Sequence, residues 1–421
     1  MEKIKIGVFG ARRGVSMIRF CAQYDLVDLV AICDFSPIAV ELCEDEIRLV
    51  GGKSPTYYAD FDEFLKHDMD AVILANYANE HAPYAIKCLN SGKHVLSEVL
   101  PVQTLKESVE LVEAVEKSGL VYAYAENFCY MPITMEMRKL FKEGKLGEFQ
   151  YGEGEYVHDC HSIWSAITRG EEDHWRNNAY ATFYCTHSLG PMIHACGLRP
   201  VKVTGFELPM PQRMIAVGCK GGLGSGGLEL VTLENGAVIK SFHACGLIRE
   251  PEGVWYSAYG TKGCIESDRW GKTVERVNIS LDGDTAETAY TPKPINTSQL
   301  AGKESGHGGG DFYIMYYFVQ KILGNPEGEN AIDIYEALDM FLPGLMAYKS
   351  ICNGNCSMDI PNFRNKEDRE KYRNDTFCTD KKVGGDMYVP PHTSNITNID
   401  KSAYEKVAEG YKDYLKVNFN R

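Results

Sequence analysis

The feature that most constrains the fold is a regular alternation of short apolar runs and amphipathic stretches over residues 1–125. The apolar runs that we interpret as strands cover residues 3–9, 26–33, 71–75, 94–97 and 121–125. Between them lie stretches with helical periodicity, such as residues 104–117. Strands that alternate with helices are typical of a parallel, doubly wound sheet. We therefore predict an N-terminal α/β domain over residues 1–125.

The pattern changes after Glu126. Pro132 opens a helical stretch, and Asn235-Gly236 marks a hairpin turn between two strands. Long alternating strands cover residues 149–159, 201–208, 227–244, 253–267 and 273–281, and helical periods cover residues 311–323 and 333–351. Long strands joined by short turns favour antiparallel pairing. We predict a second α/β domain over residues 126–364, with a large, mostly antiparallel sheet, which binds substrate and mediates oligomerisation.

The last part of the chain, residues 365–421, has a different composition. It is polar up to residue 399, contains Pro390-Pro391, and ends in a helix that begins near Lys401. This pattern is typical of an extended arm. Two interpretations stay open, a solvated tail and an arm that wraps a partner subunit. With an exposed sheet face in the second domain, the arm favours a homo-oligomer, a dimer or a tetramer.

Charge and cysteine usage exclude several classes of partner. The net charge is -14 and no long basic run occurs, so neither nucleic acid nor an anionic membrane is an expected partner. No apolar stretch has membrane-spanning length. The chain enters a strand pattern at its first residues, which predicts a cytoplasmic protein. The fourteen cysteines are scattered without CxxC spacing, so we expect reduced thiols and no metal site.

A glycine-rich turn follows the first strand and points to a dinucleotide. Gly10 fits the first position of a G-x-G-x-x-G turn, whereas Arg12 and Val15 occupy the second and third positions. Asp34 ends the second strand, where a carboxylate accepts hydrogen bonds from the adenosine ribose. This favours a Rossmann-type sheet that binds NAD. Arg12 and Arg13 leave NADP open, because they could contact a 2′-phosphate, and a turn role for Asp34 also stays open.

A polar loop follows the strand at residues 71–75. It contains Asn76, Asn79 and His81 and precedes a helix. In a doubly wound sheet, ligands bind at the carboxyl edge of the strands. We therefore expect these three side chains at the cofactor.

Several segments together resemble the Gfo/Idh/MocA oxidoreductase family over roughly residues 3–360. They are GVFGARRG, AICD, AVILANYANEHAPYAIKCL and GKHVLSEVLP. The resemblance implies NAD as the cofactor, with Glu98 near it. Most members carry Glu-Lys-Pro where this chain has Glu98-Val99-Leu100-Pro101, and that lysine takes part in proton transfer. Val99 cannot move a proton, so the usual mechanism of the family is in doubt.

Further motifs resemble one branch, the NAD-dependent glycoside hydrolase family 109. They are the segments at residues 126–130, 154–159, 184–191 and 307–311, with the sequences ENFCY, GEYVHD, YCTHSLGP and HGGGD. The resemblance implies a glycosidase that works by transient oxidation. A sugar is oxidised at C3, the C2 proton is removed, the C1 substituent leaves by elimination, water adds, and NAD is recovered. Two carboxylates flanking the glycosidic bond are not needed.

The same resemblance assigns roles to residues. Tyr156 and His187 are the candidate acid–base groups, and Tyr156 needs a lowered pKa to act as a base. Glu126 is expected near the nicotinamide. Each of the three also has a structural interpretation, as a sheet tyrosine, a helix-capping histidine and a partner of backbone amides. Six further residues are candidates for sugar binding: Tyr130, His158, Asp159, Trp175, Arg176 and Tyr184. A metal bound by residues 158–161 is disfavoured, because consecutive strand residues point to alternate faces.

Three functions remain open. The first is the NAD-dependent glycosidase that acts on a carbohydrate or glycoside. The second is an NAD-dependent sugar or keto-sugar dehydrogenase with net redox chemistry. The third is a non-enzymatic sugar or dinucleotide sensor, which the imperfect glycine pattern supports and which Tyr156 and His187 disfavour.

Overall fold

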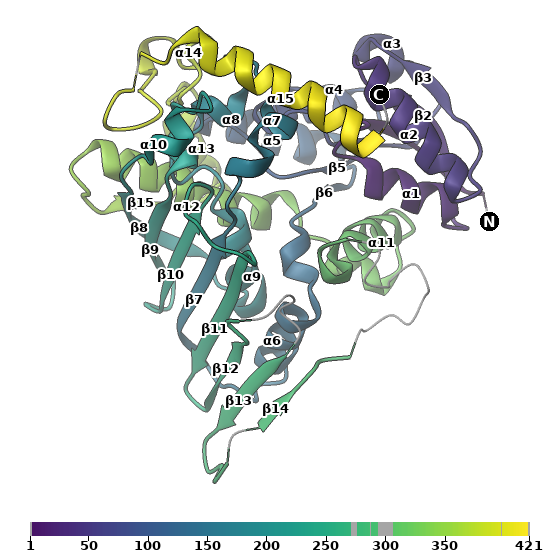
Figure 1. The fold of residues 1–421 in the computed structure, drawn as a ribbon. Helices are drawn as coiled ribbons and strands as arrows, with labels where there is room; N and C mark the ends of the chain where they lie inside the picture. Colours follow the sequence, from purple (N-terminus) through teal and green to yellow (C-terminus); the bar gives the residue numbers. More distant parts are fainter. Residues whose placement is uncertain (1, 271–275, 287, 294–305, 397, 420–421) are drawn as a thin grey trace. The chain divides into compact units, whose positions relative to one another are not determined.

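The computed structural model describes residues 2–270, 276–286, 288–293, 306–396 and 398–419 (Figure 1). The chain divides into two compact units. The first unit comprises residues Met1–Pro132, Lys293–Leu338 and Phe363–Asp375. The second unit comprises residues Ile133–Pro292, Asp339–Asn362 and Thr376–Arg421. The two units are therefore not consecutive segments of the chain. Residues 293–338 and 363–375 belong to the first unit, because they pack on the N-terminal sheet and its helices.

The first unit is built on a six-stranded parallel sheet, as the alternation of strands and helices predicts. Its spatial order is β3-β2-β1-β4-β5-β6, the order of a doubly wound sheet. The strands are β1 (Ile4–Phe9), β2 (Val27–Cys33), β3 (Thr56–Tyr58), β4 (Ala71–Leu74), β5 (His94–Ser97) and β6 (Tyr122–Tyr124). All four residues of β4 are fully buried, since helices cover both faces of such a sheet. The short strand β3 was not predicted, because its TYY sequence has no long apolar run.

Helices of this unit come from three parts of the chain. They are α1 (Val15–Gln23), α2 (Pro37–Leu49), α3 (Phe61–Leu65), α4 (His81–Asn90), α5 (Leu105–Ser118), α11 (Gly310–Ile322) and α13 (Lys366–Tyr372). Helix α5 has strong local signals: Thr104 and Glu107 form a capping box, and Gly119 ends the helix in the left-handed conformation. Helix α11 packs on α1, so it belongs to this unit although it lies almost 200 residues beyond the sheet in sequence.

The second unit contains a nine-stranded sheet, mostly antiparallel as predicted. Its order is β14-β13-β12-β11-β7-β10-β9-β8-β15, and β7 and β10 form its one parallel pair in the described ranges. The strands are β7 (Phe149–Val157), β8 (Pro200–Glu207), β9 (Gly227–Leu233), β10 (Val238–Ala244), β11 (Gly253–Gly260), β12 (Gly263–Ser267), β13 (Val277–Leu281), β14 (Thr288–Tyr290) and β15 (Met358–Asp359). Gly236, at φ +87°, makes the predicted hairpin turn between β9 and β10. Residues 273–275 of the predicted strand 273–281 lie outside the described residues.

Helices cover one face of this sheet. Helix α9 (Thr186–Cys196) packs on β7, β10 and β11, and α12 (Ile334–Cys352), which begins in the first unit, packs on β8. The remaining helices are α6 (Pro132–Lys142), α7 (Trp164–Thr168), α8 (Trp175–Asn178), α10 (Gln212–Ile215), α14 (Lys381–Gly384) and α15 (Lys401–Phe419). The opposite face is open, and it exposes large apolar side chains at Phe206, Leu230 and Tyr259.

The C-terminal segment packs against its own chain, and its role as an arm that contacts a partner subunit stays a prediction. Helix α13, near the start of this segment, packs on α5 in the first unit. Helix α15, at its end, packs on α7 in the second unit. The side chains of Arg369, Cys378 and His392 are buried. Many of the polar groups in this segment are paired within the fold.

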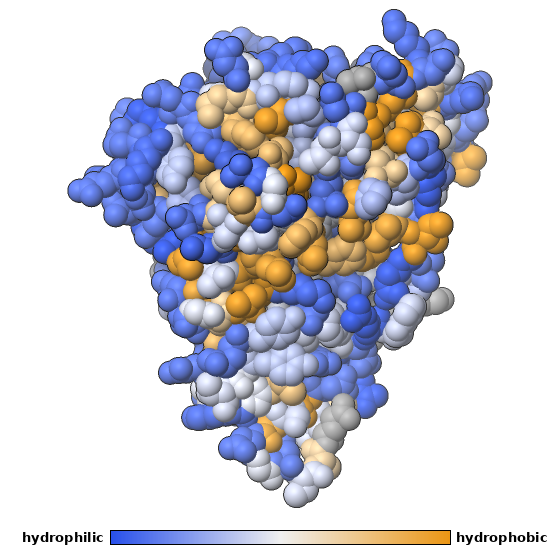
Figure 2. All heavy atoms as spheres, turned by 90° about the vertical axis from the view of Figure 1, so that its left-hand side faces the viewer, coloured by the Kyte–Doolittle hydropathy of each residue, from blue (hydrophilic) through white to orange (hydrophobic). Residues whose placement is uncertain are grey.

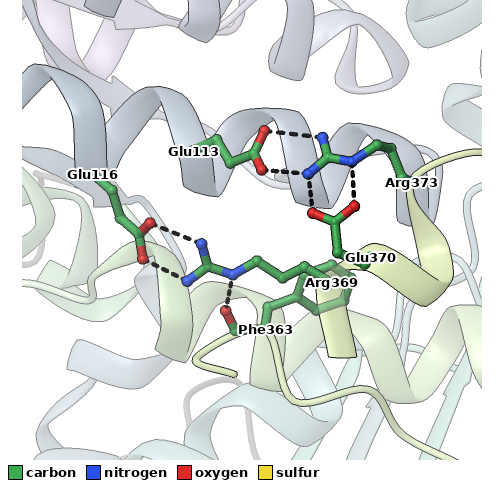
Figure 3. Close-up of polar contacts among 6 residues, drawn as sticks. All are labelled: Glu113, Glu116, Phe363, Arg369, Glu370 and Arg373. Carbon is green, nitrogen blue, oxygen red and sulfur yellow. Dashed lines mark hydrogen bonds and ion pairs between the residues drawn. The ribbon is translucent and has the colours of Figure 1, made fainter. Parts of the chain in front are cut away.

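Two arginine clamps hold α13 on α5 (Figure 3). Arg369 donates to both carboxylate oxygens of Glu116, at 2.8 and 2.5 Å, and its Nε donates to the carbonyl of Phe363. Arg373 likewise binds both oxygens of Glu113, at 3.1 and 2.6 Å. The two clamps differ in burial, because the Arg369 side chain is 3% exposed and that of Arg373 is 38% exposed.

This difference predicts unequal costs of removal. Arg369→Ala removes the arginine donors from the carbonyl of Phe363 and from the carboxylate of Glu116, which keeps the hydrogen bond from the Tyr335 hydroxyl. We expect it to lower the free energy of unfolding by about 1–3 kcal/mol, below the cost for a fully buried pair because Glu116 is partly exposed. The matched change Arg373→Ala should cost clearly less, because its ion pair is exposed and screened by solvent. Urea unfolding followed by circular dichroism measures both. Equal costs would show that burial does not distinguish the clamps.

Candidate active site

The carboxyl edge of the parallel sheet brings the expected cofactor residues together. In this sheet β1 lies between β2 and β4: strands β2 and β3 extend the sheet to one side of β1, and β4, β5 and β6 extend it to the other side. This reversal of the strand order is a topological switch point, and dinucleotides bind at such points. Gly10 follows β1, Asp34 follows β2, Asn76 lies just past β4, Glu98 follows β5 and Glu126 lies just past β6. All five therefore lie at one edge, as expected from strands that run in parallel.

The turn after β1 is shaped by two glycines. Gly10 has φ +100°, and a Cβ there would lie 2.3 Å from the carbonyl oxygen of Ala75. Gly14 precedes the first residue of α1, and a Cβ there would lie 2.7 Å from the carbonyl oxygen of Gly10. The pattern G-x-G-x-x-G put Val15 at the third position, whereas Gly14 makes the tight contact in the structure. The turn leads into the amino end of α1, whose first turn has no acidic residue, as a pyrophosphate site requires.

Asp34 ties this turn to the next one. Its Oδ2 accepts a hydrogen bond from the backbone N–H of Ala11 and its Oδ1 from that of Ser36, both at 2.8 Å. The turn role is therefore present. Each carboxylate oxygen accepts more than one hydrogen bond, so Asp34 also keeps acceptor capacity for ribose hydroxyls.

The loop after β4 offers polar groups that no protein group satisfies. Among the described residues, the buried Oδ1 atoms of Asn76 and Asn79 have no hydrogen-bond partner. Buried polar atoms are nearly always paired, so these two fit a site that a polar ligand completes. His81 has a structural role in the same loop: its Nδ1 lies 2.8 Å from the carbonyl of Leu100, and its Nε2 lies 3.3 Å from that of Asn76. Burial lowers the pKa of His81 to about 4, so it is neutral.

Glu98 binds Arg13, which bears on the choice between NAD and NADP. The buried carboxylate of Glu98 lies 2.5 Å from the Arg13 guanidinium and also accepts the N–H of Val99 at 3.2 Å. A guanidinium neutralised by a buried carboxylate is a poor partner for a 2′-phosphate. Arg12 is half-buried in the same turn. With Asp34 at the end of β2, this arrangement favours NAD.

The segment after β6 is fixed by a buried polar network. Glu126 is fully buried and accepts the N–H of Phe128 at 3.2 Å, as in its structural interpretation. Asn127 donates to Asp311 at 2.7 Å, and His307 Nδ1 lies 3.0 Å from the same carboxylate. Burial would raise the pKa of Asp311, but the hydrogen bond and charge of His307 outweigh it and hold the pKa at about 2. The HGGGD motif in the sequence does not by itself indicate this role for His307 and Asp311.

The second unit gathers the candidate acid–base groups. Tyr156, near the end of β7, has its hydroxyl 3.0 Å from His158 Nδ1. Its ring lies 5.0 Å from the His187 ring, edge to face, and His187 lies 4.9 Å from the Tyr184 ring. These four side chains therefore form one cluster, which we call the Tyr156 cluster.

The position of His187 depends on a close contact between α9 and β7. A Cβ at Gly154 would lie 1.7 Å from the carbonyl oxygen of Ser188, so only glycine permits this approach. The Tyr256 hydroxyl donates to the carbonyl of His187 at 2.5 Å. His187 thus sits in the first turn of a helix that two neighbouring strands hold in place.

The electrostatics of the cluster differ from the expectation for Tyr156. Burial raises the pKa of Tyr156 well above its ordinary value, and the nearby Tyr184 hydroxyl raises it further. In this structure Tyr156 is therefore a neutral phenol, not the tyrosinate that a lowered pKa would give. A hydrogen bond with the Cys160 thiol raises the pKa of His158, and the carboxylate of Glu252, 3.6 Å from its Nδ1, acts in the same direction.

The candidate sugar contacts fall into two groups. Arg176 lies over the ring of Trp175 at 4.3 Å and over that of Tyr184 at 5.4 Å, and Tyr184 joins this stack to the Tyr156 cluster. Asp159 instead forms an ion pair with Arg213, at 2.5 and 2.6 Å, which anchors the loop after β7. Sequence reasoning missed Arg213, because nothing local marks a partner 54 residues away. Tyr130 belongs to the first unit, where its hydroxyl donates to the carbonyl of Asn330 at 2.7 Å.

Metal sites and membrane-spanning helices are both absent from the described ranges. No three or more His, Cys, Asp or Glu side chains are grouped there in a way that could hold a metal ion. None of the helices in those ranges combines the length and apolarity that crossing a bilayer requires.

Two known protein families match this chain, one in its N-terminal part and one in its C-terminal part. Residues 4–126 match the oxidoreductase family GFO_IDH_MocA, described as an NAD-binding Rossmann fold. Residues 230–369 match the C-terminal domain of glycosyl hydrolase 109. A glycosyl hydrolase family 109 protein of Saccharopolyspora erythraea is 26% identical, over 86% of this chain and 83% of its own length. An α-N-acetylgalactosaminidase of Tannerella forsythia is 26% identical, over 80% of each chain.

Solved structures share the fold. An NAD-binding oxidoreductase from Klebsiella pneumoniae superposes with a TM-score of 0.67 at 15% identity, over 85% of this chain and 99% of its own. A levoglucosan dehydrogenase in complex with NADH and levoglucosan superposes with a TM-score of 0.65 at 16% identity, over 86% of this chain and 100% of its own.

The two family matches cover different parts of the chain, and the first agrees with the polar edge of a doubly wound sheet described above. The N-terminal part is an NAD-binding Rossmann domain, and the chain is an NAD-dependent enzyme. Residues 4–126 match the Gfo/Idh/MocA oxidoreductase family, and the chain is similar to proteins of glycoside hydrolase family 109.

Proposed function

We propose that this enzyme is a glycosidase that hydrolyses glycosides by transient oxidation of the sugar, with NAD recovered in each cycle. The observation that carries the proposal is the Tyr156 cluster, which supplies neutral and ionisable groups side by side while Val99 replaces the usual proton-transfer lysine. The relatives named α-N-acetylgalactosaminidase support an N-acetylated hexosamine as the sugar. The reduced state of all fourteen cysteines supports a reducing compartment, the cytoplasm.

The residues at the edge of the parallel sheet would hold NAD. The amino end of α1 after Gly10 would receive the pyrophosphate, and Asp34 would accept from the adenosine ribose. Asn76 and Asn79 would use their unpaired carbonyl oxygens as acceptors, while His81 holds their loop. Glu126 and the Arg13–Glu98 pair would border the nicotinamide, with Arg12 beside the pyrophosphate.

NAD, when bound, supplies the acceptor and later the donor of the hydrogen at C3 of the sugar. The protein must then move protons. Tyr156 is neutral and hydrogen-bonded to His158, so it would lose its proton to His158 as it takes one from the sugar hydroxyl. His187, whose ring lies edge to face with the Tyr156 ring, would serve the C2 proton or the leaving group. Trp175, Arg176 and Tyr184 would bind the sugar through stacking and hydrogen bonds.

A second function is favoured by one observation. The levoglucosan dehydrogenase fold shows that this architecture also accommodates a sugar dehydrogenase, in which NADH is released. Net accumulation of NADH with product distinguishes that reaction from the redox-neutral glycosidase, and the absence of any turnover of sugars would favour the sensor.

The assignment of Asp34 can be tested on NAD binding alone. Asp34→Ala removes the acceptors at the end of β2, and we expect NAD affinity to fall by about 10- to 100-fold, the usual range for hydrogen bonds to a charged group. Isothermal titration calorimetry measures this. Asp70→Ala is the matched control, because Asp70 accepts a backbone N–H at the opposite edge of the same sheet. Unchanged affinity in Asp34→Ala would place the ribose elsewhere.

The roles of Tyr156 and His187 can be tested on turnover. Tyr156→Phe and His187→Ala should each lower the turnover of 4-nitrophenyl N-acetyl-α-galactosaminide by on the order of 10²-fold or more, the usual contribution of a positioned acid or base, with NAD still bound. Tyr151→Phe is the matched control, since Tyr151 lies on the same strand and its hydroxyl binds Glu153 on the open face. Full activity in Tyr156→Phe would remove that residue from the mechanism.

The elimination step leaves an isotopic signature. Turnover in deuterated water should place deuterium at C2 of the released sugar, because the abstracted proton exchanges with solvent before water adds. Nuclear magnetic resonance of the product measures it. A product without deuterium, released with no NADH, would contradict oxidation and elimination and indicate direct hydrolysis.

The open sheet face supports a homo-oligomer, a dimer or a tetramer. On this face, polar side chains surround the exposed apolar side chains of Phe206, Leu230 and Tyr259. Figure 2 shows how hydrophobic and hydrophilic residues are distributed over one face of the molecule. Exposed apolar side chains that lie together on a protein surface usually mark an interface.

Light scattering on the full chain tests this assembly. We expect a dimer or a tetramer at micromolar concentration, and Leu230→Glu should shift it toward the monomer, because a buried charge at an interface is costly. Ile248→Glu is the control, since Ile248 is 80% exposed and lies in a loop outside the sheet. A monomeric wild-type protein would refute the proposal.

A further inference from the structure

A buried acid and a buried histidine lie beside the Tyr156 cluster and have no role in the mechanism above. Glu229 on β9 and His243 on β10 are both completely buried. In the sheet register His243 pairs with Tyr156 of β7, and Glu229 pairs with Ser241, two residues before His243. Paired residues point to the same face of a sheet. Glu229, His243 and Tyr156 therefore share the face on which α9 lies.

The hydrogen bonds of His243 determine where its proton lies. Its Nε2 is hydrogen-bonded to the carbonyl oxygen of Ala181, which can only accept, so Nε2 carries the hydrogen. In a neutral imidazole the other nitrogen is then an acceptor. That nitrogen, Nδ1, faces Glu229 Oε1 at 3.7 Å and has no other partner in the described ranges. A protonated carboxyl is the group that complements such an acceptor.

The surroundings of Glu229 favour the same protonation state. No lysine or arginine in the described part of the chain forms an ion pair with Glu229. Burial outweighs the hydroxyl of Ser241 and the backbone N–H of Glu229, which lower the pKa of its carboxyl. Burial raises the pKa of the Glu229 carboxyl to about 8, and burial lowers the pKa of His243 to about 4. Both groups are thus uncharged at neutral pH, since an isolated buried charge is expensive.

Ala181 connects this pair to the active site. A Cβ at Gly222 would lie 2.6 Å from the backbone nitrogen of Ala181, and a Cβ at Gly227 would lie 2.9 Å from its carbonyl oxygen. The backbone of Ala181 is therefore enclosed on both sides, and His243 supplies the side-chain hydrogen bond to its carbonyl. The chain then runs directly through Tyr184 into the first turn of α9 with His187.

We propose that Glu229 is a neutral carboxylic acid whose O–H is directed at His243 Nδ1, and that this pair positions the turn at Ala181 that carries Tyr184 and His187. Glu229 and His243 are positioning residues, which act on the reaction through that turn. That this turn matters to glycoside cleavage rests on the function proposed above. Three other titratable groups face the pair: His187 and Tyr156 beside His243, and Tyr180 beside Glu229.

The protonation state has a signature in the pH dependence of stability. The pKa of Glu229 rises from 4.5 in the unfolded chain to about 8 in the folded one, so its stabilising contribution is complete below pH 4.5 and is lost as the pH rises through 8. Glu229→Gln keeps an amide donor for Nδ1 and does not titrate. Between pH 5 and pH 8 the unfolding equilibrium constant of the wild type, relative to Glu229→Gln, should rise by about tenfold per pH unit.

Glu207→Gln is the matched control for this measurement. Glu207 is also buried beside a histidine, His392, at 3.6 Å, but its Oε2 accepts hydrogen bonds from the backbone N–H and the hydroxyl of Thr393. Its ratio to the wild type should show no such rise. Urea unfolding of the NAD-loaded full chain gives both ratios. A constant ratio for Glu229→Gln would overturn the neutral acid.

The positioning role is tested on His187 by nuclear magnetic resonance of the NAD-loaded protein labelled at the ¹³Cε1 atoms of histidine. His187→Gln identifies the His187 signal by its loss. We expect this signal in the wild type to shift as Glu229 ionises near pH 8, and to show no such step in Glu229→Gln. His392→Gln should leave the step unchanged. A His187 signal that titrates identically in the wild type and Glu229→Gln would refute the coupling.

Neither measurement depends on turnover. An enzyme that hydrolyses no glycoside would therefore refute the proposed function while both signatures of Glu229 persist. Conversely, an active glycosidase without these signatures would refute only the inference about Glu229 and His243.

Discussion

The contact between the first turn of α9 and the middle of β7 is the constraint on which the Tyr156 cluster depends. At Gly154 the carbonyl of Ser188 occupies the space that a Cβ would need, and the Ser188 and Ser241 hydroxyls meet at 2.9 Å beside it. Backbone and small polar groups replace larger side chains in this layer. The helix can therefore approach closely enough for the His187 ring to meet the Tyr156 ring, so the acid–base geometry follows from one position without a side chain.

Ionisable side chains in this protein either form an ion pair or stay uncharged, and the degree of burial decides between the two. Arg369, Asp159 and Arg13 each have an opposite charge in direct contact, because each lies where water still reaches part of the pair. Glu229 has no cation partner in the described residues and stays protonated instead. Burial likewise makes Tyr156 a weak acid. A proton that moves between Tyr156 and a neighbouring group does not leave an isolated buried charge.

The N-terminal half shows how much local sequence can predict. The strands β1, β2, β4, β5 and β6 fall within the predicted runs, because a buried parallel strand must be apolar along its whole length. The carboxyl edge follows from that order, and Gly10, Asp34 and Asn76 are found there. Local sequence does not indicate contacts between residues that are distant along the chain: α11 and α13 belong to the N-terminal unit, and parts of the polar segment after residue 365 pack on earlier helices.

The sequence by itself determined the two sheets, the cofactor edge and the identity of the candidate catalytic residues, since each of these rests on apolar periodicity, glycine turns or short motifs. The tertiary structure alone decided how those residues behave. The raised pKa of Tyr156, the pairing of Arg13 with Glu98 and of Asp159 with Arg213, and the placement of Glu229 beside His243 all arise from strands and helices that meet across tens of residues. Burial and partners set a pKa, and neither is encoded in the residues adjacent in sequence.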